Sequence, residues 1–186
     1  MRGSPDRYSR LARSFHWMTV VLVIVAWLLG IFGDDLPKGS VRNVGLTIHM
    51  FAGLAIVLLL VGRITLSLVD PAPKAASTEF GVWLGRWSDP ASRIMHYLLY
   101  ALLFAVPVCG IVLQFARGDP ISLFGLIHIS SPWIEDRVFA GSVKDIHELL
   151  AHLLVGLAAL HSVAVLLHHF VFHDRTLIRM LPPRKS

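Results

Sequence analysis

Cysteine is almost absent from this sequence. The chain has 186 residues and a single cysteine, Cys109. One thiol cannot form an intramolecular disulfide, a cysteine-based zinc site or a thiolate-bound iron–sulfur cluster. The CxxCH pattern of covalently attached haem is missing as well. These classes of site are therefore excluded within one chain.

Charged residues are scarce too, and long stretches have none. Asp, Glu, Lys and Arg make up 16% of the chain, whereas 55% of its residues are hydrophobic. Soluble domains are usually about 45–50% apolar. From Leu149 to Phe172 there is no charged residue, and a run of that length can cross a bilayer as a helix. Three further apolar blocks precede it.

These blocks predict an all-α fold, an integral membrane four-helix bundle that forms one domain over residues 1–186. The expected helices cover residues 14–33, 44–67, 92–116 and 145–172. The first block could be a signal peptide, but its apolar run is too long and no cleavage pattern follows, so we expect a retained helix. A short interfacial helix is expected at residues 79–87, which include Trp83 and Trp87.

Positive charge lies between the apolar blocks. The net charge is +5, which in a soluble protein would favour nucleic acid as a partner. Here it indicates topology instead, and no nucleic-acid binding is expected. Twelve of the 17 Lys and Arg residues lie in the N-terminal segment, the second loop and the tail. The positive-inside rule therefore predicts a multi-pass protein of the bacterial cytoplasmic (inner) membrane with both termini in the cytoplasm.

The fourth block and its lead-in are rich in histidine. The residues are His147, His152, His161, His168 and His169. Polar side chains in hydrocarbon usually face the bundle interior and have partners. His147 and His161 stand fourteen residues apart, so they lie about 40° apart around a helix and about 21 Å apart along it. Two ligands for two cofactors stacked across the membrane would need this spacing.

The order and direction of the four helices place two other histidines at the same depths in the membrane as His147 and His161. His16 lies at the level of His161, and His49 lies at the level of His147. The matching holds in either orientation of the bundle. We therefore hypothesise two b-type haems, with the pairs His16–His161 and His49–His147 as axial ligands of the two irons.

Other readings of the histidines stay open. A membrane histidine often donates a hydrogen bond between helices or relays protons, so a transporter without haem is one alternative. His96 begins its helix on the same side as His16 and competes with it. His152 lies about 140° around the helix from His147 and is a poor ligand for the same haem. We assign no role to His128, His169 or His173.

Five segments resemble a known family. They are YSRLARSFHW (Tyr8–Trp17), IHMFAGLAIVLLLVGR (Ile48–Arg63), RGDP (Arg117–Pro120), HELLAHLLVGLAALH (His147–His161) and the ending RMLPPRKS. Their order and spacing resemble the small four-helix di-haem branch of the bacterial cytochrome b561 family, closest to its superoxide-oxidising members. The resemblance covers nearly the whole chain.

The resemblance implies both a function and an alternative. It implies a cytoplasmic-membrane protein with two haem b groups, held by His16, His49, His147 and His161. Superoxide would be oxidised to dioxygen at the periplasmic side, and electrons would pass through the haems to ubiquinone. More distant relatives are haem subunits, so the alternative is electron transfer between a periplasmic redox protein, hydrogenase- or dehydrogenase-like, and the quinone pool.

Further residues are candidates for binding rather than ligation. Quinone needs donors and a proton source near the cytoplasmic side, and the candidates there are His96, His168, Arg93 and Trp87. Haem propionates need cationic partners, and the candidates are Arg10, Arg13 and Arg63. Basic residues at the periplasmic side could steer a small anion, and these are Lys38, Arg42, Arg117, Arg137 and Lys144. Acidic residues in the same loops oppose this steering. No catalytic residue is assigned.

Overall fold

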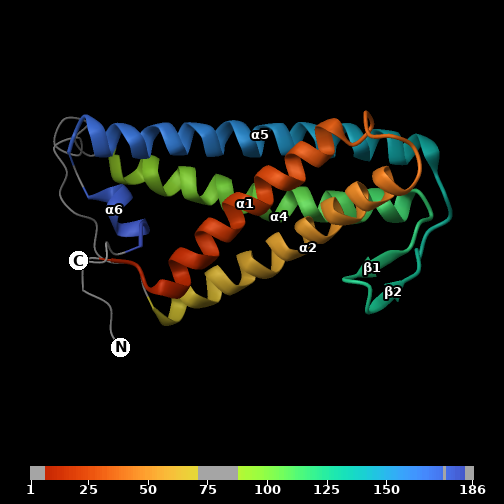
Figure 1. Ribbon diagram of the computed structural model, residues 1–186, viewed down its shortest axis with the longest axis horizontal. Coiled ribbons are helices and arrows are strands. Elements are labelled where there is room, and N and C mark those ends of the chain that lie inside the picture. Colours follow the sequence, from red (N-terminus) through yellow and green to blue (C-terminus); the bar gives the residue numbers. More distant parts are fainter. Residues whose placement is uncertain (1–6, 71–87, 174, 183–186) are drawn as a thin grey trace.

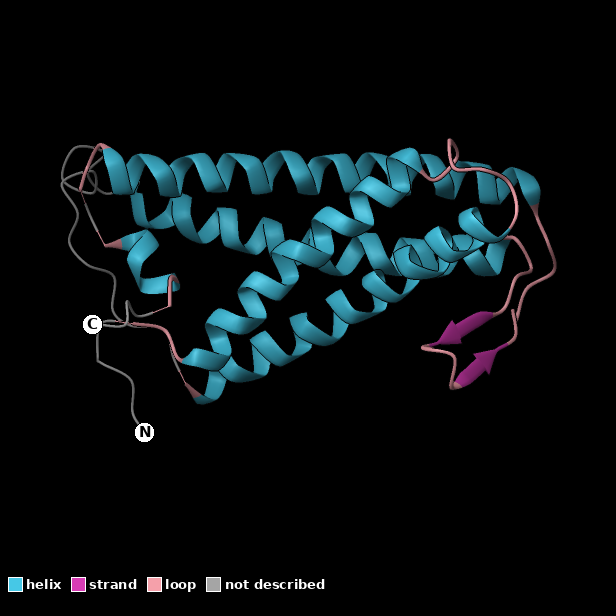
Figure 2. Cartoon of the chain, viewed as in Figure 1, coloured by secondary structure: helices cyan, strands magenta, loops and turns pink. Residues whose placement is uncertain are grey.

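The computed structural model describes residues 7–70, 88–173 and 175–182. Its elements, in order, are α1 (Arg10–Phe32), α2 (Ser40–Val69), α4 (Ser88–Ala116), β1 (Ile121–Leu123), β2 (Ile127–Ile129), α5 (Arg137–Phe170) and α6 (Thr176–Met180). Trp87 and the interfacial helix expected at residues 79–87 lie outside the described residues. Figures 1 and 2 show a bundle of long helices with one small hairpin.

Four of the helices, α1, α2, α4 and α5, are long and apolar enough to cross a membrane. The predicted fold class, an all-α membrane bundle of four helices, is confirmed. The helices are longer than expected at several ends. The largest difference is α5, which begins eight residues before the predicted start. There the Asp136 carboxylate accepts from the backbone N–H groups of Val138 and Phe139, which caps the helix.

The helices pack as two antiparallel pairs. α1 lies mainly against α2, and α4 against α5, while α2 and α4 join the pairs. The buried core between them consists of Ile56, Leu60, Leu103 and Leu154. Leu154 stands seven residues from both His147 and His161. An apolar layer therefore separates the two depths at which the histidines lie.

One end of the bundle, here called the α6 end, is closed by the C-terminal segment. The start of α1 and the short helix α6 both lie at this end (Figure 1). The Arg13 guanidinium donates to the Leu181 carbonyl at 2.7 Å, and the Trp17 indole donates to the Met180 carbonyl at 3.0 Å. Two side chains of α1 thus satisfy carbonyls at the exit of α6.

The opposite end, here called the hairpin end, carries strands β1 and β2. They pair antiparallel, with Ile121 opposite Ile129. The Phe124 ring in the turn lies 5.4 Å from the Phe51 ring, so the hairpin reaches the side of α2. From Pro132, Trp133 and the charged residues after them, the sequence predicts a cap over one end of the bundle for residues 117–142. The hairpin instead lies against the side of α2. Phe124 and Gly125 both have positive φ, which suits a tight hairpin turn.

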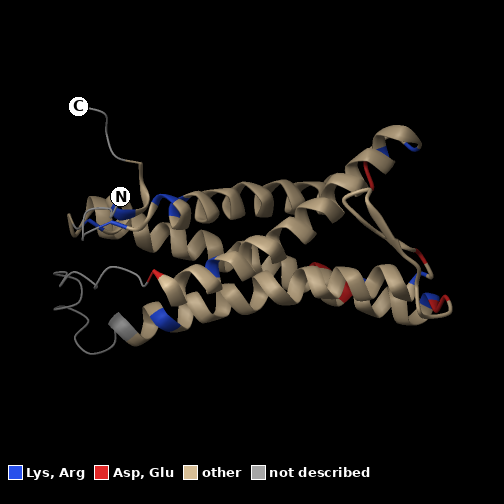
Figure 3. Ribbon diagram, turned by 90° about the horizontal axis from the view of Figure 1, so that it is seen from below, with Lys and Arg blue, Asp and Glu red and all other residues tan. Residues whose placement is uncertain are grey.

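Charge follows the two ends of the bundle. Figure 3 shows most Lys, Arg, Asp and Glu near the two ends and a few part-way along the helices, while the long apolar stretches carry none. Many apolar side chains on those stretches face outward. A helix surface of this kind needs lipid rather than water around it, so the chain is a multi-pass membrane protein.

Candidate haem sites

The imidazoles of His49 and His147 lie close together toward the hairpin end, with their planes at 66°. His49 comes from α2 and His147 from α5, and their ring centroids are 6.1 Å apart. Both side chains are half-buried. The two residues that were matched in depth from the sequence therefore stand side by side across the two helix pairs.

Each of these rings is held by a carbonyl of a further helix. His49 Nδ1 lies 2.8 Å from the Ala26 carbonyl of α1, and His147 Nδ1 lies 3.0 Å from the Val106 carbonyl of α4. A carbonyl only accepts, so Nδ1 must carry the proton in both rings. The lone pair then lies on Nε2, the tautomer that a metal-bound imidazole needs.

Three imidazoles gather toward the α6 end. The His96 ring of α4 lies 5.3 Å from the His161 ring of α5. His16 of α1 lies near both of them. His161 thus contacts the ring of His96, which competes with His16 for the role of second ligand. The ring of His16 contacts its neighbour Trp17, with centroids 5.4 Å apart.

Imidazoles thus gather at two depths of an apolar four-helix bundle. The family model for prokaryotic cytochrome b561 matches residues 7–183. The chain belongs to the prokaryotic cytochrome b561 family. Members of this family are membrane cytochromes that carry b-type haem and transfer electrons.

Curated relatives match over almost their full length. Probable superoxide oxidase CybB of Yersinia pestis is 33% identical over 182 residues, covering 97% of this chain and 98% of that protein. Cytochrome b561 homolog 1 of Escherichia coli K12 is 29% identical over 188 residues, with 97% and 99% covered. Cytochrome b562 of Cereibacter sphaeroides is 28% identical over 185 residues, with 95% and 96% covered.

The hairpin-end pair of this cytochrome fits an iron bound from two sides. With metal–nitrogen bonds of about 2.0–2.1 Å, and a ring centre about 1.1 Å beyond each nitrogen, opposed imidazoles have centroids roughly 6 Å apart. The spacing of His49 and His147, 6.1 Å, agrees with this. Within the described residues no three His, Cys, Asp or Glu side chains gather to hold a bare metal ion. Two imidazoles suit a metal that brings its own macrocycle.

The α6 end has unpaired arginine nitrogens that could bind the propionate groups of a haem. In the described part of the chain, four buried side-chain atoms have no hydrogen-bond partner, and all belong to residues of this end: Arg7 Nη1, Arg13 Nε, His16 Nδ1 and His169 Nδ1. A buried unpaired donor costs about 1–3 kcal/mol. Arginine nitrogens without a hydrogen-bond partner can donate to the carboxylates of haem propionates. Arg7 was not among the residues predicted from the sequence.

The other two predicted propionate partners, Arg63 and Arg10, lie in different surroundings. Arg63 places its guanidinium 5.4 Å from the centre of the Tyr100 ring, and its charge acts on His16 and His161. It therefore belongs to the histidine cluster of the α6 end. Arg10 is exposed, at the start of α1.

Of the predicted quinone residues, His96 contacts the cluster through the ring of His161. His96 is exposed and its Nδ1 lies 2.7 Å from the Ser92 carbonyl of its own helix. Arg93 is exposed one turn earlier. The His168 ring lies 5.8 Å from the Phe172 ring of its own segment. Trp87 lies outside the described residues.

His152 has a partner of a different kind. The Trp27 indole of α1 donates to His152 Nδ1 at 3.2 Å. This bond joins α1 to α5, which otherwise share few contacts. In the described structure His152 thus contacts Trp27 of α1, whereas His49 and His147 contact each other.

The cations of the hairpin end are largely paired. Arg42 forms an ion pair with Asp34, and Lys144 lies 4.0 Å from Asp34 and 3.4 Å from Glu148. Arg137 pairs with Glu135 at 2.7 Å. Three of the five predicted steering residues thus have carboxylate neighbours, which weakens a simple positive face.

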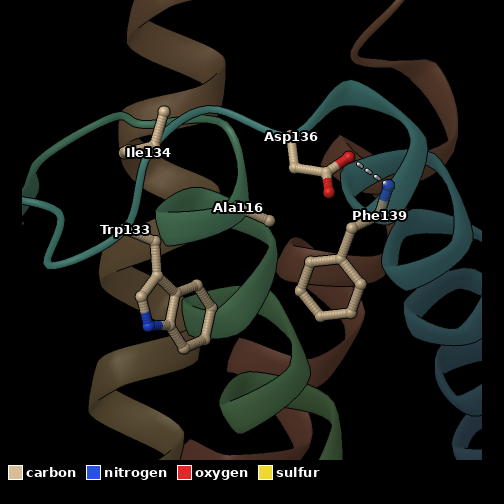
Figure 4. Close-up of a pocket in the computed structure, with 5 residues that line it drawn as sticks. All are labelled: Ala116, Trp133, Ile134, Asp136 and Phe139. Carbon is tan, nitrogen blue, oxygen red and sulfur yellow. Dashed lines mark hydrogen bonds between the residues drawn. The ribbon is translucent and has the colours of Figure 1, made fainter.

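A cavity of about 270 Å³ also lies at the hairpin end. Figure 4 shows it between Ala116 of α4, the loop residues Trp133, Ile134 and Asp136, and Phe139 of α5. The Asp136 carboxylate is engaged in capping α5. No histidine lines the cavity, so it is separate from the imidazole pairs.

Proposed function

We propose that this family member is a di-haem cytochrome b that oxidises superoxide to dioxygen at the hairpin end and reduces ubiquinone at the α6 end. The hairpin end would face the periplasm, and both termini the cytoplasm of a bacterial inner membrane. The observation that carries the proposal is the neighbouring pair His49 and His147, each with Nδ1 held by a carbonyl. The 33% identity to a probable superoxide oxidase supports the substrate.

Two haems would each supply a one-electron carrier within the bundle. His49 and His147 would hold the haem of the hairpin end, and His16 and His161 that of the α6 end. His16 is favoured over His96 as ligand because His16 is half-buried whereas His96 is exposed. The Ser92 carbonyl gives His96 the same tautomer as His49 and His147, so His96 is the competing ligand. Arg7, Arg13 and Arg63 would pair with propionates there.

His96 would then be free for quinone. It lies against His161 and faces outward, where a lipid-soluble substrate arrives. An imidazole can donate a hydrogen bond to a quinone carbonyl and deliver a proton. His168 and Arg93 lie near the same membrane surface and complete the candidate quinone site, to which the sequence adds Trp87.

The overall reaction balances without another reactant. Two superoxide anions give two molecules of dioxygen and two electrons. One quinone takes up those two electrons and two protons and becomes a quinol. Proton uptake at the α6 end fits the histidines there, and the hairpin end needs only to admit a small anion.

Absorption spectra and rapid mixing test the proposal. The purified protein should contain two haems per chain, with spectra of low-spin bis-histidine iron. Mixing the oxidised protein with superoxide should reduce haem at a second-order rate approaching the diffusional range. A colourless protein would contradict haem binding altogether. Two haems with slow reduction by superoxide would contradict the substrate alone.

A second candidate is an electron-transfer subunit for a periplasmic redox protein. One observation favours it: apolar side chains at the hairpin end are strongly exposed, among them Leu126 (85%), Ile134 (93%) and Val138 (83%). Exposed apolar groups of this kind occur where proteins dock. In this reading reduction by superoxide would be slow, and a reduced periplasmic protein would reduce the haems quickly.

A further inference from the structure

The carbonyls that hold His49 and His147 share one local arrangement. Each stands four residues before a glycine of its own helix: Ala26 before Gly30 in α1, and Val106 before Gly110 in α4. In a helix, positions i and i+4 lie on the same face, one above the other. Glycine at the later position leaves the carbonyl oxygen open to a second donor from a neighbouring helix.

The space between each glycine and the neighbouring histidine ring is small, and it is smaller at Gly110 than at Gly30. A methyl group on Gly110 would lie 3.2 Å from Cε1 of His147 and 3.6 Å from its Nδ1. A methyl group on Gly30 would lie 3.5 Å from Cε1 of His49 and 3.8 Å from its Nδ1. The first contact forces the ring to give way, whereas the second is an ordinary van der Waals distance.

We propose that Gly110, and to a lesser degree Gly30, are positioning residues that set how closely the two ligating imidazoles approach their carbonyl acceptors. The inference rests on the proposed function, because it takes His49 and His147 as haem ligands. Neither glycine contributes a side-chain atom to the site. They act on the length and angle of the Nδ1–H···O=C hydrogen bond.

That hydrogen bond tunes the metal. An acceptor on the far nitrogen fixes the ring orientation and raises the basicity of the ligand. A more basic imidazole stabilises ferric iron over ferrous iron. Pushing the His147 ring away from Val106 therefore weakens the ligand and raises the reduction potential of the haem that it holds.

Three alanine variants test the inference. Gly110→Ala and Gly30→Ala add a methyl group beside a ligating ring. Gly156→Ala is the matched control, because it lies in α5 and a methyl group there meets no atom within 4 Å. The measurements on each purified protein are haem content, a redox titration of the haem absorbance, and the electron paramagnetic resonance of the ferric haems.

Gly110→Ala should raise one of the two midpoint potentials, move one low-spin ferric signal and leave the other haem unchanged. Haem affinity at that site should fall by about tenfold or more. Gly30→Ala should shift the same transition, in the same direction and by less, because His49 and His147 share one haem. Gly156→Ala should match the wild type.

Each contrary result has a definite meaning. Two haems with unchanged potentials in both Gly110→Ala and Gly30→Ala overturn the inference and leave the proposed function intact. Shifts in different transitions also overturn it, because the two rings would then serve different haems. Should Gly110→Ala fail to accumulate, Gly30→Ala decides by its shift relative to Gly156→Ala. A wild-type protein without haem removes the proposed function itself.

Discussion

The imidazole of His96 lies 5.3 Å from that of His161, and the two rings meet at 77°. This contact joins α4 to α5 at the depth where the sequence pairs His161 with His16 of α1. Three imidazoles and the charge of Arg63 therefore share the α6 end. One haem takes two axial ligands, so one of the histidines has another task.

Alanine variants of His16 and His96 distinguish the two assignments. His16→Ala should lose about half of the haem, because an axial ligand with a buried unpaired Nδ1 is removed. His96→Ala should keep both haems and slow the reduction of a soluble quinone analogue. Haem extraction and stopped-flow spectra give both quantities. The opposite result would make His96 the ligand.

His168 tests the candidate quinone site separately. His168→Ala should retain two haems and reduce the rate of haem reoxidation by quinone, since the imidazole is a proton source near the α6 end. The rate is followed after the haems have been reduced chemically, so the step at the hairpin end does not contribute. Loss of haem in this variant would refute the assignment.

At the hairpin end, His147→Ala should remove one haem while His152→Ala should retain both. The two residues lie on the same helix, and only His152 is engaged by the Trp27 indole. Loss of that bond costs about 0.6 kcal/mol, the average for a hydrogen bond between membrane helices. Pyridine haemochrome spectra give the haem content. Equal haem loss in the two variants would indicate a general folding defect instead.

The ion pairs near His147 predict how salt affects the encounter with superoxide. Asp34 neutralises Arg42 and approaches Lys144 at 4.0 Å. Asp34→Asn should release positive charge, raise the rate of haem reduction by superoxide and make that rate fall more steeply with ionic strength. Stopped-flow measurements over a range of salt concentrations test this. A slower reaction in Asp34→Asn would argue against anion steering.

The C-terminal segment should be loosened by Trp17→Phe. The substitution keeps an aromatic ring but removes the indole donor to the Met180 carbonyl. The loss is expected to be about 0.5–1.5 kcal/mol, the usual net value of one hydrogen bond. Trypsin should therefore cut faster near Arg179 in membranes that expose the α6 end. Unchanged cleavage would show that Arg13 and the remaining contacts suffice to hold α6.

The turn between β1 and β2 illustrates what the sequence left hidden. Its central residues include Phe124 with positive φ, whereas the usual sequence signal for such a turn is Asn or Asp before Gly. The sequence therefore predicts no hairpin at this position. The start of α5 was placed too late for a related reason. The Asp136 carboxylate caps α5, so the helix already begins at Arg137 and includes charged and polar residues that precede the apolar stretch.

Gly30 and Gly110 were missed for another reason. A glycine in an apolar helix is unremarkable by itself. Its meaning depends on which side chain of another helix lies against it, and only the packing shows that His49 and His147 do so. Arg7 was likewise indistinguishable from the other basic residues near the N-terminus until its buried Nη1 was seen to lack a partner in the described structure.

The sequence by itself determined the membrane fold and the depth of each histidine. Apolar length and the 1.5 Å rise of a helix are local properties, so His49 and His147 could be matched in height from connectivity alone. Only the tertiary structure decided which side chains meet at a given height. The rotation of each helix about its axis is set by packing against its neighbours, and this rotation turned His96 toward His161 and Trp27 toward His152.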